Sequence, residues 1–413
     1  MEDKLFKKNF LWNMIGTTLN SFNSMFFMII ITRINGTEDA GLYTLVFSIV
    51  CLLYNIGIYA GRTFQVTDQT NRYNDTEYVI HRMMTVSLMF VVAAGYCAIK
   101  KFDPFRFALT MLLTIMKCLE AGTDVLYGLM QKNDELYKSG ISLTIKSIGS
   151  LLAVLVINLL FQNLLLSFIF VDVICFIVTI LYDIPSTKQF LSKEYSIKKS
   201  LNLFREGFYA FAYFFLNVYL SNVSKYALDG KVSSSQQAMF GIVLMPATLI
   251  NLCAIYLLQP YINRLGLLYS ENRIVDFKQS VKKIIVYILL FGIICLTGAT
   301  LIGVPVLNVV YNVDLSGYLS SLQLIIIGAT LIAIVTVLST ALTTFRNTKT
   351  QFVIYVIVSL AILAISGTLV DQFGVLGATY TYLLSTILQF ILYVLAYKKE
   401  MKQWNITCNK LTI

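Results

Sequence analysis

Three charged residues interrupt an otherwise apolar stretch of the chain at residues 107–130, and their spacing is that of one helix face. Lys117, Glu120 and Asp124 stand at positions i, i+3 and i+7, which a helix brings to one side. Each costs free energy inside a bilayer unless it is paired or hydrated. Lys117 is placed to pair with Glu120, which leaves the carboxylate of Asp124 as a net negative charge. We therefore expect this face to meet a wet cavity or other charges.

Lys146 and Asp172 lie inside the next apolar stretches, and two interpretations of all five charges remain open. In the first, ion pairs hold the helices together, Lys117 with Glu120 and Lys146 with either Asp124 or Asp172. In the second, the cations bind an anionic substrate, and a carboxylate among Glu120, Asp124 and Asp172 binds a coupling H⁺ or Na⁺. The sequence does not decide between these two interpretations.

Arg33 and Lys225 form a second set, because each follows a long uncharged run. The segments after them, 33–49 and 225–245, share an order of features: a cation, a glycine with an acid, a polar stretch, an aromatic residue and a new apolar run. A parallel internal repeat would bring the two cations to opposite walls of one cavity. The alternative is ordinary snorkelling of a basic residue at a helix end.

The elements that must position these residues are long uncharged runs. A bilayer core about 30 Å thick needs about 20 apolar residues, and such segments cross as helices because lipid offers the backbone no hydrogen bonds. The chain of 413 residues is 57% hydrophobic and 13% charged, against roughly 25% charged in soluble proteins. Ten runs of 17 to 32 residues contain no Asp, Glu, Lys or Arg: 9–32, 40–61, 83–99, 147–171, 207–224, 232–263, 284–313, 315–345, 350–370 and 372–397.

Two corrections bring the number of spans to twelve. Residues 147–182 contain one charge and are long enough for two helices that turn near Gln162 and Asn163. Residues 107–130 add a further span despite their three charges. The sequence thus predicts an all-α polytopic membrane protein, with about twelve transmembrane helices in two six-helix halves around a central cavity.

The distribution of basic residues predicts the orientation and the domains. With both termini cytoplasmic, the inner segments hold 24 Lys and Arg and the outer segments 5, as the positive-inside rule requires. The net charge of +10 therefore reflects topology and contacts with membrane lipids, with no nucleic acid as partner. We expect an N-terminal half at 1–185, a cytoplasmic amphipathic linker at 186–205, a C-terminal half at 206–397 and a cytoplasmic tail at 398–413.

The usual signatures of an enzyme are missing from the sequence. It contains no GxxxxGK[ST] or HExxH motif, and the single histidine, His81, is expected to be a solvated residue at the start of a span. Membrane glycosyltransferases and polymerases generally carry a long loop at their active face, and every predicted loop here is short. We therefore expect a transporter and no catalytic residues, metal or other cofactor beyond a coupling ion.

Four segments resemble one family of transporters in their order along the chain. They are KNFLWNMIGTTLNSFNSMFFMIIITRINGTEDAGLY (8–43), GRTFQVTD (61–68), NVSKYALDG (222–230) and FGIVLMPATLIN (240–251). Together they resemble Wzx-type O-antigen and capsule flippases of the multidrug/oligosaccharidyl-lipid/polysaccharide (MOP) exporter superfamily. The likeness covers nearly the whole chain, and twelve spans in two halves match the architecture of that superfamily.

The resemblance implies a substrate and a set of residues for it. The substrate would be an oligosaccharide repeat unit on undecaprenyl diphosphate, moved by alternating access from the inner to the outer leaflet of a bacterial cytoplasmic membrane. Arg33 matches the basic residue of the family after the first span and Lys225 its counterpart in the second half. Arg62 lies where the diphosphate would enter, and Asp39 matches an acidic gate position. Lys117 adds a further cation for the substrate.

The resemblance has limits. The second half carries Lys225 where an arginine would complete the symmetry, and Glu120, Asp124 and Asp172 cannot be carried over from the family, so their role in ion coupling or gating is a hypothesis. The polysaccharide polymerase machinery is an expected partner in assembling O-antigen, lipopolysaccharide or capsule. The alternative function is a multidrug or cation antiporter of the same fold, of the MATE type. Asn20, Asn23, Asn217 and Tyr219 are candidates for contacts with sugars.

Overall fold

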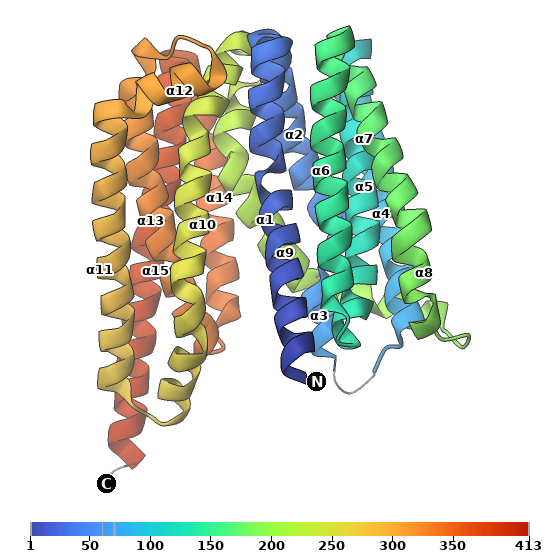
Figure 1. Cartoon of the computed structure of the whole chain (residues 1–413). Helices are drawn as coiled ribbons and strands as arrows, with labels where there is room; N and C mark the ends of the chain where they lie inside the picture. The colour runs from blue at the N-terminus through green and yellow to red at the C-terminus, as the bar shows by residue number, and fades with distance from the viewer. Residues whose placement is uncertain (1, 60, 69–71, 412–413) are drawn as a thin grey trace. The chain divides into compact units, whose positions relative to one another are not determined.

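The computed structural model describes residues 2–59, 61–68 and 72–411, and this part of the chain is helical without strands (Figure 1). It forms two compact units, residues 1–218 and residues 219–413, here called unit 1 and unit 2. The helices of unit 1 are α1 (Glu2–Ile34), α2 (Thr37–Ile58), α3 (Gly61–Thr67), α4 (Asp75–Ile99), α5 (Pro104–Lys132), α6 (Leu136–Phe161), α7 (Leu164–Val178), η1 (Thr179–Asp183), α8 (Ile184–Thr187), η2 (Lys188–Phe190) and the first part of α9 (Ile197–Leu228).

Unit 2 holds the end of α9 and the remaining helices. They are α10 (Ser234–Ser270), α11 (Ile274–Gly298), η3 (Ala299–Gly303), α12 (Val304–Tyr311), η4 (Ser316–Tyr318), α13 (Leu319–Thr344), α14 (Thr348–Phe373) and α15 (Val375–Leu411).

The helices confirm the predicted class of a multi-pass membrane protein. Ten helical segments of the described chain are long and apolar enough to cross a bilayer. The two remaining predicted spans correspond to α5 and α9, which are 29 and 32 residues long. Three charges interrupt α5, and polar and tyrosine residues dilute the apolar character of α9. The observed helices are therefore consistent with about twelve spans.

The predicted turn at Gln162 and Asn163 is also confirmed, and its geometry explains why these residues stand there. Gln162 ends α6 in the left-handed conformation at φ 45°, the conformation in which helices commonly end. The Asn163 side chain accepts a hydrogen bond from the Leu166 backbone N–H, which satisfies a donor at the start of α7. One long apolar run thereby becomes two helices.

Glycines allow α1 and α6 to pack with their backbones in contact, and these two helices lie side by side (Figure 1). A Cβ atom on Gly140 would collide with the backbone carbonyl of Trp12, and one on Gly16 with the backbone of Gly140. Small residues at a helix crossing are the usual route to close contact in a bilayer, where apolar burial adds little. This crossing sets the position of the Asn20 and Asn23 side chains relative to α6.

The segment predicted as the linker, residues 186–205, is fastened to unit 1 in the structure. Residues 191–196 are not helical, and α9 begins at Ile197 and continues unbroken into the predicted seventh span. The side chains of Asn74 and Thr76 donate to the carbonyls of Glu194 and Ser192, and the Ser196 N–H donates to Glu77. The boundary between the two units lies further along, between residues 218 and 219 of α9.

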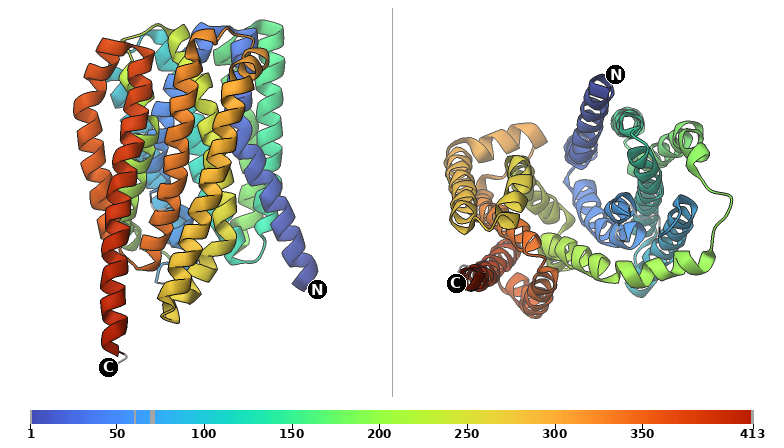
Figure 2. Two further views of the ribbon diagram at one scale, coloured as in Figure 1. Left: turned by 90° about the vertical axis from the view of Figure 1, so that its left-hand side faces the viewer. Right: turned by 90° about the horizontal axis from the view of Figure 1, so that it is seen from below.

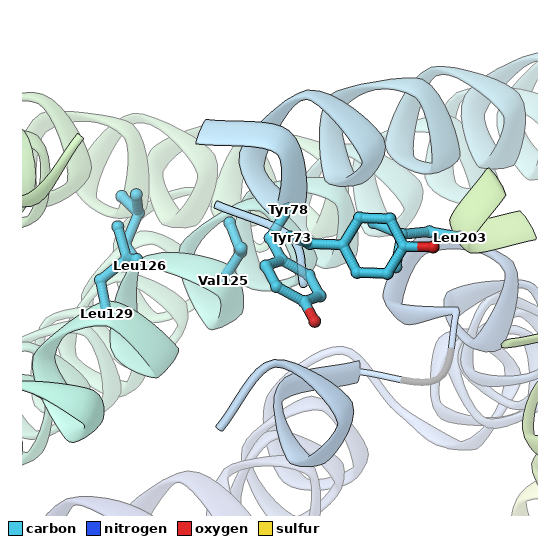
Figure 3. Close-up of a cluster of buried hydrophobic side chains, with 6 residues drawn as sticks. All are labelled: Tyr73, Tyr78, Val125, Leu126, Leu129 and Leu203. Atoms are coloured by element: carbon cyan, nitrogen blue, oxygen red, sulfur yellow. The ribbon is translucent and has the colours of Figure 1, made fainter. Parts of the chain in front are cut away.

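An apolar cluster beneath these hydrogen bonds adds to the attachment of the linker. Figure 3 shows Tyr73, which lies just before α4, and Tyr78 of α4 beside Leu203 of α9, with Val125, Leu126 and Leu129 on α5. Leu129 is fully buried and Leu203 nearly so. The first turns of α9 therefore share a core with α4 and α5.

The predicted tail, residues 398–413, continues α15 as a helix to Leu411 (Figure 2). Trp404 packs against the rings of Tyr269, Phe277 and Phe345. Glu400 accepts a hydrogen bond from the Asn347 side chain. These contacts join the tail to the end of α10, the start of α11 and the loop after α13 within unit 2.

The α1–α6 crossing generates a first prediction. Gly140→Ala should lower the free energy of unfolding by about 1–3 kcal/mol, because the added methyl group must push two backbones apart. Gly122→Ala on α5 is the matched control, since its Cβ would meet open space, and it should be neutral or stabilising by about 0.5–1 kcal/mol. Thermal unfolding in detergent measures both variants, and equal midpoints would contradict the close crossing.

Candidate functional site

The predicted pair of Lys117 and Glu120 is present in the middle of α5. The Lys117 Nζ atom lies 2.6 Å from the Glu120 Oε2 atom. The ammonium group also lies 5.4 Å from the ring centroid of Phe47 and 5.1 Å from that of Tyr54, within the range of cation–π attraction. Two aromatic rings and one carboxylate therefore offset the free-energy cost of placing this cation within the bilayer.

This pair lies on the wall of a cavity inside unit 1, here called the unit 1 cavity. Its volume is about 260 Å³, and helices α1, α2, α5, α6 and α7 all contribute to its wall. Its polar lining includes Asn20, Asn23, Lys117, Glu120, Tyr127 and Lys146. Two of the four side chains that the sequence suggested for contacts with sugars, Asn20 and Asn23, therefore line a cavity. The prediction of a central cavity between the two halves is a separate one and remains a prediction.

Lys146 pairs with Asp183, so the predicted pairing with Asp124 or Asp172 is wrong. The distance from Lys146 Nζ to Asp183 Oδ2 is 2.6 Å, and the Asp183 side chain is completely buried. Lys146 also donates to the Tyr127 hydroxyl at 3.3 Å. Asp183 ends a π-helical turn, η1, a distortion that is common at functional sites. In the sequence it lies just past the apolar stretch 147–182, so it was not included among the charges inside the spans.

Asp124 also has a partner that the sequence interpretation missed. Arg82 of α4 lies 3.1 Å from the Asp124 carboxylate and donates a second hydrogen bond to the Gly57 carbonyl. The Arg82 side chain is only 5% exposed. The expected uncompensated negative charge on α5 is therefore neutralised. Arg82 was overlooked because it borders an uncharged run and was counted with the inner loop.

Arg62 lies close to the same ion pair, at the start of the short helix α3. Its Nε atom donates to the Gln131 side chain at 2.7 Å, and its backbone N–H hydrogen-bonds the Asp124 carboxylate. Burial lowers the pKa of the Arg62 guanidinium, and the nearby Asp124 opposes that shift. The structure thus brings Arg62 and Asp124 together, two residues that the sequence had placed in separate sets.

Asp172 is the carboxylate that remains after these pairings. It lies on α7 with 8% exposure, and neither carboxylate oxygen has a hydrogen-bond partner in the protein. Arg82, Lys117 and Lys146 pair with Asp124, Glu120 and Asp183. A buried carboxylate with neither an ion pair nor a hydrogen bond is costly, and this sets Asp172 apart from these three.

Arg33 and Lys225 occupy locally equivalent positions. Each lies in the last turn of a long helix, α1 or α9, and is followed by a glycine with positive φ, 95° at Gly36 and 72° at Gly230. Asp39 lies in the first turn of α2, just beyond Gly36. Because Arg33 belongs to unit 1 and Lys225 to unit 2, their meeting across a central cavity stays a prediction.

His81 is not the solvated residue that the sequence suggested. It is 7% exposed, and its Nδ1 atom lies 3.1 Å from the Ser200 carbonyl of α9. Its ring also packs edge-on against Phe204. The histidine therefore helps to hold the start of α9. In the described chain, no group of three or more His, Cys, Asp or Glu side chains is arranged to hold a metal ion.

The Lys146–Asp183 pair generates a prediction about stability. Lys146→Met should lower the free energy of unfolding by about 3–5 kcal/mol, because it leaves a buried carboxylate without its partner. The double variant Lys146→Met/Asp183→Leu should recover most of that loss, since both charges are then gone.

The more exposed pair of Lys138 and Glu135, 2.7 Å apart, is the control for this experiment. Lys138→Met should change the unfolding free energy by no more than about 1 kcal/mol. Thermal unfolding in detergent measures all three variants. A double variant no more stable than Lys146→Met would show that Lys146 and Asp183 do not compensate each other.

The chain was compared with known proteins in sequence and in structure. The chain matches no protein-family model. It is 23% identical over 350 residues, 79% of this chain and 85% of the other, to a capsular polysaccharide biosynthesis protein, CapF, of Staphylococcus aureus.

Solved structures of transporters are similar over nearly the full chain. The lipid II flippase MurJ in an inward closed conformation has a TM-score of 0.70 at 13% identity and covers 96% of this chain and 90% of its own. An inward-facing multidrug resistance MATE family transporter of the MOP superfamily has a TM-score of 0.69 at 10% identity, covering 95% of this chain and 98% of its own. The chain therefore has the fold of the MOP-superfamily transporters.

Proposed function

We propose that this protein is a flippase for oligosaccharide repeat units linked to undecaprenyl diphosphate, and that it acts by alternating access in a bacterial cytoplasmic membrane. The fold is that of transporters, and the resemblance to known flippase segments lies in both halves of the chain. The similar protein from Staphylococcus aureus is named for capsular polysaccharide biosynthesis. One structural neighbour is a flippase of another lipid-linked saccharide, lipid II. The repeat units that it moves would then be assembled into a surface polysaccharide.

The observation that best supports this proposal is that cationic side chains of the protein form ion pairs with its acidic side chains. A transporter of cationic drugs needs carboxylates that are open to its substrate. Here Glu120 pairs with Lys117, and Asp124 pairs with Arg82. The acidic residues that kept the multidrug alternative open are thereby occupied, with the exception of Asp172.

The basic side chains provide the chemistry that a diphosphate requires. An arginine such as Arg33 or Arg62 offers a planar fork that matches phosphate oxygens, and a lysine such as Lys225 acts as a compact charge. In the proposed mechanism Arg62, near the predicted cytoplasmic end, receives the diphosphate, and Arg33 and Lys225 hold it during passage. Asp39, in the first turn of α2 and six residues after Arg33 in sequence, competes with the diphosphate for that cation and so favours release.

Export of surface polysaccharide tests the proposal. In a strain whose own copy is deleted, Arg33→Ala and Lys225→Ala should each reduce export about tenfold or more, because each removes a charge-assisted contact of ~1.5–3 kcal/mol. Immunoblots of the membrane fraction should show normal amounts of both variants. Arg273→Ala is the control, since Arg273 is exposed and pairs only with its near neighbours Glu271 and Asp276 among the recorded ion pairs.

Two results would contradict the flippase. Normal export by both variants would remove these cations from the mechanism. A deletion strain with intact surface polysaccharide and increased sensitivity to cationic drugs would favour the multidrug antiporter.

We further propose that Asp172 couples transport to an H⁺ or Na⁺ gradient. Both of its carboxylate oxygens are buried and have no hydrogen-bond partner in the described protein, so binding a cation there removes an electrostatic cost. Asp172→Asn should abolish gradient-driven transport in proteoliposomes and leave exchange without a gradient intact. The same variant should unfold at an equal or higher temperature, because a costly buried charge is gone.

The control for Asp172 is Asp314→Asn, which alters an exposed carboxylate in the loop before α13. It should leave gradient-driven transport unchanged. A fall in the unfolding temperature or in membrane abundance of Asp172→Asn would instead show that Asp172 has a structural role.

A further inference from the structure

The unit 1 cavity has a wall that is polar but electrically balanced. Lys117 on the wall is neutralised by Glu120, also on the wall, and Lys146 is neutralised by Asp183 behind it. A diphosphate needs a surplus of positive charge, and a free cation needs a surplus of negative charge. Neither surplus is present on this wall, so the ligand that the cavity suits is polar and uncharged.

The hydrogen-bonding groups of the cavity match a ligand that both donates and accepts. Asn20 and Asn23 stand one turn apart on α1 and both line the cavity, as their i, i+3 spacing requires. Each amide offers two donors and an acceptor. The Asn23 Oδ1 atom is buried and has no hydrogen-bond partner in the protein. Such a group loses free energy until a ligand or water satisfies it.

The volume of the cavity and the aromatic side chains on its wall further limit the class of ligand that fits. A volume of about 260 Å³ lies just below the range of about 300–1,000 Å³ typical of sites for drug-sized molecules. Phe27 and Phe47 form part of the same wall, and an aromatic ring packs well against the apolar face of a flat ring. One sugar ring has this combination of a small volume, many hydroxyl groups and an apolar face.

We propose that the unit 1 cavity is a subsite for a single uncharged sugar residue of the transported oligosaccharide. Asn20 and Asn23 determine its specificity by hydrogen bonds to hydroxyl or acetamido groups. The Lys117–Glu120 pair supplies a donor and an acceptor side by side without adding net charge. This inference rests on the proposed function, because it assigns part of the same substrate to a place in unit 1.

Binding of free sugars to the purified full-length protein in nanodiscs tests the subsite. The probes are glucose, galactose, N-acetylglucosamine and N-acetylgalactosamine at millimolar concentration, followed by saturation-transfer NMR and by thermal shift. At least one probe should bind the wild type, and Asn20→Ala and Asn23→Ala should each weaken it by roughly three- to tenfold. Asn251→Ala is the control, since its Oδ1 atom is also buried and unpartnered but lies on α10 of unit 2 and should leave binding unchanged.

The outcomes separate the subsite from the proposed function. If no probe binds and both asparagine variants export polysaccharide normally, while Arg33→Ala does not, the subsite is wrong and the flippase stands. If a sugar binds through Asn23 but the deletion strain makes normal polysaccharide, the subsite stands and the flippase is wrong. If replacing choline chloride by sodium chloride shifts the unfolding temperature and Asn23→Ala abolishes that shift, the cavity binds a cation and the sugar proposal fails.

Discussion

The constraint on which the rest of this structure depends is the cost of an isolated charge inside a bilayer. Three cations on α4, α5 and α6 of unit 1 each have a carboxylate within 3.1 Å: Arg82 with Asp124, Lys117 with Glu120 and Lys146 with Asp183. The pairs join α4 to α5 and α6 to the π-helical turn after α7, so they also determine how these helices are rotated. Removing one partner leaves the other uncompensated, which is why such pairs are costly to break even where they add little net stability.

Compensation of these charges also decides what the interior can bind. The wall of the unit 1 cavity contains one balanced ion pair and several amide and hydroxyl groups. Because this wall has no net charge, it does not attract a multivalent anion or a metal cation. The cations that suit a diphosphate, Arg33 and Lys225, instead end long helices and are followed by glycines with positive φ. In the proposed flippase, charge recognition and sugar recognition would therefore use different residues. Asp172, whose buried carboxylate has no hydrogen-bond partner in the described protein, is the residue proposed to bind the coupling ion.

Much of the fold could be predicted because its signals are local. Uncharged length indicated the spans, Gln162 and Asn163 marked a helix turn, and the i, i+3 spacing placed Lys117 beside Glu120. The errors arose where a residue stood at the border of an uncharged run. His81 was predicted to be solvated, and Arg82 and Asp183 were not among the predicted site residues, yet the structure buries all three. A helix that extends one or two turns beyond its uncharged run carries such residues inward, and hydropathy does not register the partner that makes their burial tolerable.

The sequence by itself determined that this chain is an all-helical, multi-pass membrane protein, because the length and apolarity of a segment suffice to require a helix in lipid. It also determined that charges within those helices need partners. Only the tertiary structure decided which partners they have. That choice depends on the rotation of each helix, on the glycine crossing of α1 and α6, and on the π-helical turn that presents Asp183 to Lys146. These features join residues from separate helices, and no spacing along a single helix encodes them.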